Sequence, residues 1–151
     1  MKVVHEIQIQ QTCQSCELKN TDFFCDLASS NLKQLESIKV TKAYQKDSTL
    51  FLEGQPSRGV YLLCQGKVKL STCSPEGKII ILGIAEAGEI LGLSAAINGV
   101  EYETTAETLE LCQVNYVNTS DLLRFLQSNP EACFNAARQL SLNYQAACRQ
   151  V

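Results

Sequence analysis

The sequence predicts a mainly β domain: an eight-stranded antiparallel jelly roll flanked by short helices and followed by a long C-terminal helix. Between residues 39 and 117, short runs rich in Val, Ile, Leu, Tyr and Thr alternate with Gly, Pro, Ser and Asn. About eight such runs at ~8–12-residue spacing are typical of an antiparallel sandwich or barrel. On both sides of this region, apolar residues recur instead at the three- and four-residue steps of a helix.

Segments with turn chemistry separate the expected strands. Each of the segments 53–56, 65–66, 74–77, 87–88 and 98–99 contains glycine, and two of them also contain proline. The strands that these turns delimit are 38–44, 49–52, 59–64, 67–73, 78–85, 89–91, 102–107 and 109–117.

Helices are expected before and after the roll. Residues 26–38 carry leucine and isoleucine at three-residue steps behind a pair of serines, which are candidate N-cap residues. After the last strand, the Asn-Thr-Ser sequence at 118–120 is suited to cap a short amphipathic helix. Asn129-Pro130 then starts the long helix, because proline is accommodated in the first helical turn.

The long helix carries a stripe that predicts pairing with a second copy. Residues at three- and four-residue steps over more than two heptads form the seam of a coiled coil. The candidate seam residues are Phe134, Ala137, Leu140, Ser141, Tyr144, Cys148 and Val151. The alternative is a helix that packs on its own barrel. No C-cap signal precedes Val151, so we expect the chain to be part of a longer protein.

Composition narrows the class of protein. The chain has 151 residues, 45% hydrophobic and 19% charged, which is typical of one globular domain. A net charge of −3 argues against a broad basic face for nucleic acid. No apolar run approaches the ~20 residues of a membrane span, and the N-terminus does not have the pattern of a secretory signal. We therefore expect a cytoplasmic protein with reduced thiols and no membrane partner.

Eight cysteines are the unusual feature of the composition. Cys13, Cys16 and Cys25 crowd the N-terminus in C-x2-C-x8-C spacing. The sequence around Cys112 alternates on a strand, so this residue is either inward packing or a ligand. The remaining cysteines have apolar neighbours and are interpreted as packing; they are Cys64, Cys73, Cys133 and Cys148.

Three segments together resemble the sensor half of Crp/Fnr-type transcription regulators. The first is residues 49–54 (TLFLEG) followed by 60–70 (VYLLCQGKVKL), which resemble the family's LF..G and Y....G pattern. The second, residues 87–92 (AGEILG), resembles the opening of the family's phosphate-binding cassette, and the third, residues 102–110, resembles the end of that cassette. The resemblance implies a tail at 1–22, a cyclic-nucleotide-binding-like sensor domain at 23–128 and the start of a dimerisation helix at 129–151. It also implies that DNA is bound only by a helix-turn-helix domain absent from this chain.

The cassette departs from the members of the family that bind cAMP. Those members use a glutamate for the ribose and an Arg-Ser pair for the cyclic phosphate. The corresponding positions here are Gly92, Leu93, Ser94, Ala95, Glu103, Thr104 and Thr105. They supply no arginine, and a glutamate near phosphate is repulsive. We therefore expect a degenerate effector pocket that does not bind cAMP.

The Fnr branch of this family implies a cofactor. That branch holds a [4Fe–4S] cluster with three N-terminal cysteines and one on a late strand of the roll, and Cys13, Cys16, Cys25 and Cys112 correspond to them. The x8 spacing before Cys25 is longer than the branch's own spacing. From the residues alone, a zinc site of the same four thiolates, a Cys13–Cys16 thiol–disulfide switch and inert thiols remain open.

These features predict an effector- or redox-sensing and dimerisation domain of a transcription regulator, not an enzyme. The alternative is an interaction module with a degenerate pocket. A cupin-like enzyme on the same architecture needs several histidines on the strands to hold a metal, and the expected roll contains none.

Overall fold

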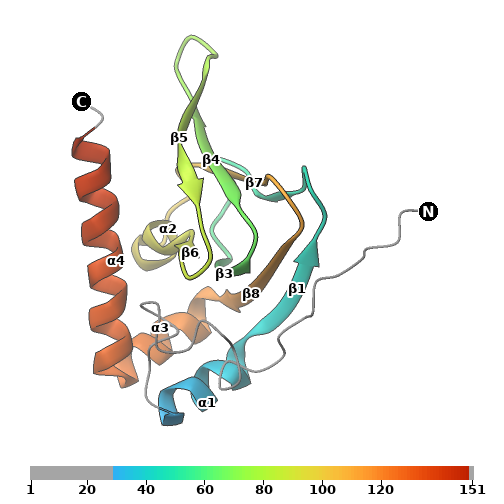
Figure 1. Cartoon of the computed structure of the whole chain (residues 1–151). Coiled ribbons are helices and arrows are strands. Elements are labelled where there is room, and N and C mark those ends of the chain that lie inside the picture. Colours follow the sequence, from blue (N-terminus) through green and yellow to red (C-terminus); the bar gives the residue numbers. More distant parts are fainter. Residues whose placement is uncertain (1–28, 150–151) are drawn as a thin grey trace.

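Eight strands form two four-stranded antiparallel sheets in the computed structural model, which describes residues 29–149 (Figure 1). The strand order is β1-β8-β3-β6 in one sheet and β2-β7-β4-β5 in the other. The strands are β1 (Val40–Tyr44), β2 (Thr49–Phe51), β3 (Gly59–Gln65), β4 (Val68–Cys73), β5 (Ile79–Ala85), β6 (Ile90–Leu91), β7 (Thr105–Thr108) and β8 (Cys112–Asn118). The predicted jelly roll is confirmed.

Four helices complete the described part of the chain, and they lie against one side of the roll (Figure 1). They are α1 (Ser29–Ile38), α2 (Leu93–Asn98), α3 (Thr119–Ser128) and α4 (Pro130–Cys148). The predicted cap of α3 is confirmed, because the Asn118 side chain accepts a hydrogen bond from the backbone N–H of Asp121 at 2.9 Å. Pro130 opens α4 as predicted. The predicted first residues of α1, 26–28, lie outside the described residues.

Two parts of the fold differ from the prediction. Helix α2 was not expected, because its six residues are too few to show a helical period. The strand expected at 102–107 begins instead at Thr105. Tyr102 N–H donates to the carbonyl of Gln55 at 2.9 Å, and Gly54 N–H donates to the carbonyl of Tyr102 at 2.9 Å. The backbone at Tyr102 is therefore paired with the β2–β3 loop rather than with β4.

The core has two parts on opposite sides of the sheet that contains β3 and β8. One lies between the sheets, where inward-facing residues such as Leu63, Val68 and Val114 are fully buried. The other lies under the helices, where Leu32, Phe125 and their neighbours join α1, α3 and α4 to the outer side of β3 and β6. Burial of each large side chain contributes about 1.5–3 kcal/mol, so the helices are held to the roll chiefly by this second cluster.

One face of α4 packs on the roll and the opposite face is exposed. Ala132, Ala136 and Gln139 are buried, whereas the helical period places Phe134 on the other side, where it is 64% exposed. Leu140 differs from the seam prediction: it is half-buried and packs against the cluster under the helices, because it lies next to the Ala136 side of α4. Val151 lies outside the described residues.

A buried amide ties α4 to the edge of the roll. The Gln139 side chain donates from Nε2 to the carbonyl of Ile90 at 2.7 Å and accepts from the N–H of Ile90 at 3.0 Å. Both residues are almost fully buried. The side chain thus takes the place of a strand along the edge of β6 that does not pair with β3.

No helix in the described residues is long and apolar enough to cross a membrane.

Candidate functional site

The cassette between β6 and β7 is filled by an aromatic side chain of the chain itself. Gly92 has a φ of +85°, and a Cβ on it would lie 2.8 Å from Cε1 of Tyr102. The Tyr102 ring stacks on Phe51 with 4.0 Å between centroids, and its hydroxyl donates to the carbonyl of Gly59 at 2.6 Å. Burial raises the pKa of Tyr102, so the phenol stays protonated and remains a donor. Glycine at position 92 therefore serves both the backbone turn and the close approach of this ring.

The residues predicted to form the effector pocket do not converge on one cavity. Leu93 and Ala95 are buried in the core, so the position expected to face a ribose faces apolar side chains. Thr105 accepts a hydrogen bond on Oγ1 from the N–H of Glu53 at 2.9 Å, which closes the end of β7 onto the β2–β3 loop. Of the predicted set, only Glu103 lines the neighbouring cleft.

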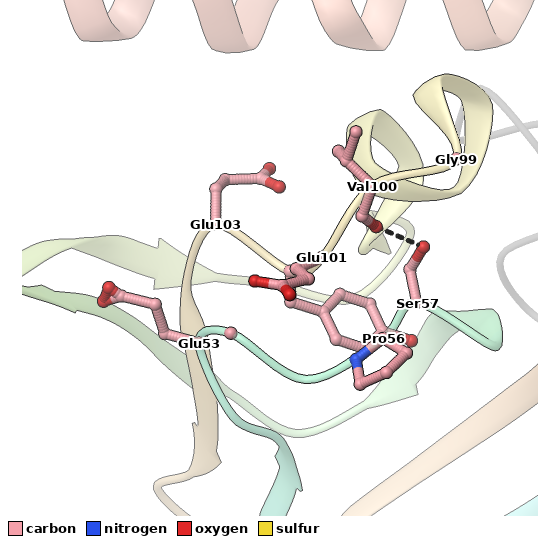
Figure 2. Close-up of a pocket in the computed structure, with 9 residues that line it drawn as sticks. Glu53, Pro56, Ser57, Gly99, Val100, Glu101 and Glu103 are labelled. Atoms are coloured by element: carbon pink, nitrogen blue, oxygen red, sulfur yellow. Dashed lines mark hydrogen bonds between the residues drawn. The ribbon is translucent and has the colours of Figure 1, made fainter.

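That cleft is an open depression of about 800 Å³ with an acidic rim (Figure 2). Glu53, Glu101 and Glu103 line it, and no lysine, arginine or histidine is among its described lining residues. The Ser57 hydroxyl donates to the carbonyl of Val100 at 2.6 Å and joins the two walls. Carboxylates repel anionic groups, so the described rim of this cleft is negatively charged.

Glu53 is held in its ionised form by two donors from β4. The backbone N–H of Cys73 donates to its carboxylate at 2.9 Å, and the Thr72 hydroxyl donates at 2.8 Å. These hydrogen bonds hold the pKa of Glu53 below its usual value. The cleft therefore keeps this negative charge at neutral pH.

Cys112 is a core thiol whose sulfur lies against the backbone of Gly66. It is fully buried, and its Sγ lies within hydrogen-bond distance of the carbonyls of Glu110 (3.3 Å) and Lys67 (3.4 Å). Burial raises its pKa, so the thiol is protonated at neutral pH in this arrangement. The cover above it is Gly66, where a Cβ would lie 2.5 Å from the sulfur.

The other cysteines separate into one buried and three exposed residues. Cys64 is buried, which confirms the packing interpretation for it. Cys73, Cys133 and Cys148 are exposed, so packing within this chain is wrong for these three; Cys148 remains a candidate seam residue. They lie at the end of β4 and on faces of α4 that turn away from the roll, where apolar sequence neighbours do not imply burial.

The three N-terminal cysteines predicted as ligands lie outside the described residues. Within residues 29–149, no group of three or more His, Cys, Asp or Glu side chains is placed to hold a metal ion. Cys112 is thus the one predicted ligand whose surroundings the structure describes.

A polar junction joins α1 to the start of α4. Asn129, which is 6% exposed, donates from Nδ2 to Oε1 of Gln34 at 2.8 Å and to the carbonyl of Phe125 at 2.8 Å. Asn31 donates to Oε2 of Glu131 at 3.3 Å. The helix that follows the cysteine-rich segment is therefore hydrogen-bonded to the turn from which α4 starts.

Sequence reasoning placed Tyr102 only as an alternative (Tyr102-Glu103) for the phosphate-binding position and missed both its ring packing and the role of Gln139, which organise this region. A tyrosine beside a turn, or a glutamine in a long helix, is ordinarily at the surface, so neither carries a local signal. Asn129 was predicted only as the start of α4, and its link to α1 depends on a contact 95 residues distant in the sequence.

The comparisons with known proteins agree with this geometry. The profile of the cyclic nucleotide-binding domain family matches residues 41–129. The anaerobic regulatory protein of Bacillus subtilis is 30% identical over 118 residues, which are 77% of this chain and 50% of that protein. The fumarate and nitrate reduction regulatory protein of Vibrio cholerae is 31% identical over 114 residues, 73% of this chain and 45% of that protein.

Among solved structures, the catabolite activator protein of Thermus thermophilus has a TM-score of 0.75 to this chain, at 22% identity. The match covers 85% of this chain and 60% of that one. This likeness supports the fold alone.

The chain belongs to the cyclic nucleotide-binding domain family. The predicted relation to Crp/Fnr-type regulators is confirmed by the curated relatives and the fold. The chain spans about half the length of the curated relatives it matches.

The packing of Tyr102 over Gly92 predicts the effect of adding one methyl group. Gly92→Ala is expected to lower the free energy of unfolding by about 2–4 kcal/mol, from left-handed backbone strain and collision with the ring. The matched control is Gly83→Ala, where a Cβ meets nothing within 4 Å; it is expected to change stability by less than about 1 kcal/mol. Urea unfolding of both variants measures the difference, and equal midpoints would contradict the account.

Proposed function

We propose that this chain is the effector- or redox-sensing and dimerisation domain of a Crp/Fnr-type transcription regulator. The observation that carries the proposal is the Gln139–Ile90 amide pair, which joins the edge of the cassette to a long helix whose other face is exposed. A change in the roll is thereby transmitted to α4. The similarity to anaerobic and fumarate and nitrate reduction regulatory proteins supports the same class.

The rest of the regulator's activity follows from this class. DNA is bound by a helix-turn-helix domain outside this chain, in the cytoplasm, and the chain itself is not catalytic. Two discrete arrangements of α4 would have to differ in their preference for the signal, because a ligand shifts an equilibrium only through differential affinity.

The exposed face of α4 supports a homodimer. Phe134 is 64% exposed, Tyr144 71% and Leu142 47%, and Ala137, Ser141 and Cys148 lie on the same side as Phe134. The β4–β5 hairpin adds an apolar surface with exposed Ile79, Ile80, Ile81, Leu82 and Ile84. Exposed apolar surfaces of this kind mark protein–protein contacts.

A charge on this face is expected to dissociate the dimer. Tyr144→Glu places a carboxylate in the proposed seam, where burying it unpaired is unfavourable. Asn143→Glu is the matched control, since Asn143 is exposed and the helical period turns it away from Phe134. Sedimentation velocity should show a dimer for the unmodified chain and the control, and a monomer for Tyr144→Glu. A monomeric unmodified chain, or identical behaviour of the two variants, would contradict the seam.

We further propose that Cys13, Cys16, Cys25 and Cys112 hold a [4Fe–4S] cluster. Four cysteine thiolates are the usual donors of such a cluster. When bound, the cluster supplies an oxygen- or redox-sensitive centre. The fit at Cys112 depends on its cover: Gly66 has no side chain, so only backbone separates the sulfur from the surface.

The chain's own residues decide how Cys112 becomes a ligand. Its thiol must lose a proton before it ligates a metal, and burial disfavours the thiolate. We infer that the turn at Gly66, which lies against the sulfur, moves when Cys112 becomes a ligand. Hydrogen bonds from Asn31 to Glu131 and from Asn129 to Gln34 join α1, the helix after the three N-terminal cysteines, to the start of α4.

Reconstitution of the chain under anaerobic conditions tests the cluster. We expect about four irons and four sulfides per chain with broad visible absorption, and loss of most of this iron in Cys112→Ala. Cys64→Ala is the matched control, because Cys64 is also a buried cysteine but is not in the proposed set; it should retain the cluster. A cooperative thermal unfolding transition is required of both variants, as the control that each is folded.

Each other outcome of this experiment is decisive. A colourless, iron-free chain, or a Cys112→Ala variant with unchanged iron, would overturn the cluster. Zinc bound in its place would favour the tetrathiolate zinc site, and a disulfide mapped between Cys13 and Cys16 after oxidation would favour the thiol–disulfide switch.

We also propose that the cassette does not bind cAMP. The acidic rim of the cleft and the Tyr102 ring over Gly92 support this, because both oppose a nucleotide phosphate at the cassette.

A further inference from the structure

A second cleft, lined by aromatic rings and two cations, lies at the open end of the roll beside β1. It has a volume of about 480 Å³, within the range of roughly 300–1,000 Å³ typical of small-molecule sites. Tyr61 and Tyr116 are partly exposed among its lining residues, and the almost fully buried Phe51 and Tyr102 rings lie behind them. Pro56 and Tyr102 line both this cleft and the acidic cleft.

The aromatic walls are fixed before any ligand arrives. The Tyr61 and Tyr116 rings meet edge to face with 5.1 Å between centroids, and Phe51 lies 5.7 Å from Tyr61. The Tyr61 hydroxyl donates to the carbonyl of Leu50 at 3.2 Å, which anchors the ring across the two sheets. Burial raises the pKa of Tyr61, so its phenol is neutral. Fixed walls lower the entropy lost on binding.

The charge of this cleft is opposite to that of the whole chain. The chain carries a net charge of −3, yet Lys42 and Arg58 line the cleft and no Asp or Glu is among its described lining residues. The Lys42 ammonium lies 4.8 Å from the centroid of the Tyr116 ring, a cation–π contact. Within residues 29–149, neither cation forms an ion pair.

We propose that this cleft binds a small aromatic carboxylate. The aromatic ring of such a ligand stacks on the tyrosine walls, and its carboxylate is held by the Arg58 guanidinium and the Lys42 ammonium. A purely aliphatic acid cannot stack on the aromatic rings. An uncharged arene cannot form an ion pair with Arg58 or Lys42. The combination of rings and cations is what selects the ligand class. None of its described lining residues is a cysteine or belongs to the proposed seam.

Calorimetry and amide chemical shifts with benzoate as the probe test the proposal on the 151-residue chain. Benzoate is expected to bind saturably and to shift the amides of Lys42, Tyr61 and Tyr116. Arg58→Gln should weaken binding about tenfold, as expected for loss of one charge-assisted hydrogen bond. Lys78→Gln is the matched control, because Lys78 lies on the exposed β4–β5 turn away from the cleft, and it should bind like the unmodified chain.

Comparison ligands make the test specific. Cyclohexanecarboxylate and toluene should each bind at least about tenfold more weakly than benzoate. Cyclohexanecarboxylate lacks the aromatic ring, and toluene lacks the negative charge. Absence of saturable benzoate binding, shifts confined to other residues, or equal affinity in Arg58→Gln and Lys78→Gln would overturn the proposal. Equal affinity for cyclohexanecarboxylate would reduce the cleft to a general anion site and would also overturn it.

Discussion

The Gln139 amide on the edge of β6 is the interaction on which the arrangement of roll and helix depends. Strand β6 has only two residues and pairs with β3 on one side alone. Its other edge is covered by a side chain from a helix 49 residues later, which satisfies both the N–H and the carbonyl of Ile90. Leaving either group buried and unpaired costs about 1–3 kcal/mol. The cassette and α4 are therefore held in one register by directional bonds as well as by apolar packing.

This constraint divides α4 into a fixed and a free part. The first turns are held by Asn129, Ala132, Ala136 and Gln139, whereas every described residue from 141 onward is exposed. A small rotation of the fixed part about its contacts displaces the far end of a helix of 19 residues, which is about 28 Å long at 1.5 Å per residue. With this geometry, a local change in the roll can move the C-terminal end of α4. The acidic cleft and the aromatic cleft share Pro56 and Tyr102, and the Tyr102 ring packs against Gly92 of the cassette.

The strands and the long helix were predictable because they depend on local patterns. The apolar run at residues 59–64 and the turn glycines locate β3 and its neighbours, and Asn118 and Asn129-Pro130 mark two helix starts. Tyr102, Gln139 and the Lys42–Arg58 cleft were not predictable, since each depends on residues brought together by the sheet order. The exposed Cys73, Cys133 and Cys148 illustrate the same limit, because apolar sequence neighbours on a helix or strand end do not determine which face a residue occupies.

Native-state hydrogen exchange tests the coupling of roll and helix most directly. If the Ile90 N–H is protected by Gln139, it becomes exposed when α4 leaves the roll, so its opening free energy should equal that of the central α4 amides around Leu140. We expect the two opening free energies to be equal, because amides of one cooperative unit exchange through the same opening. An Ile90 amide that stays protected to global unfolding while α4 opens at much lower free energy would contradict the account.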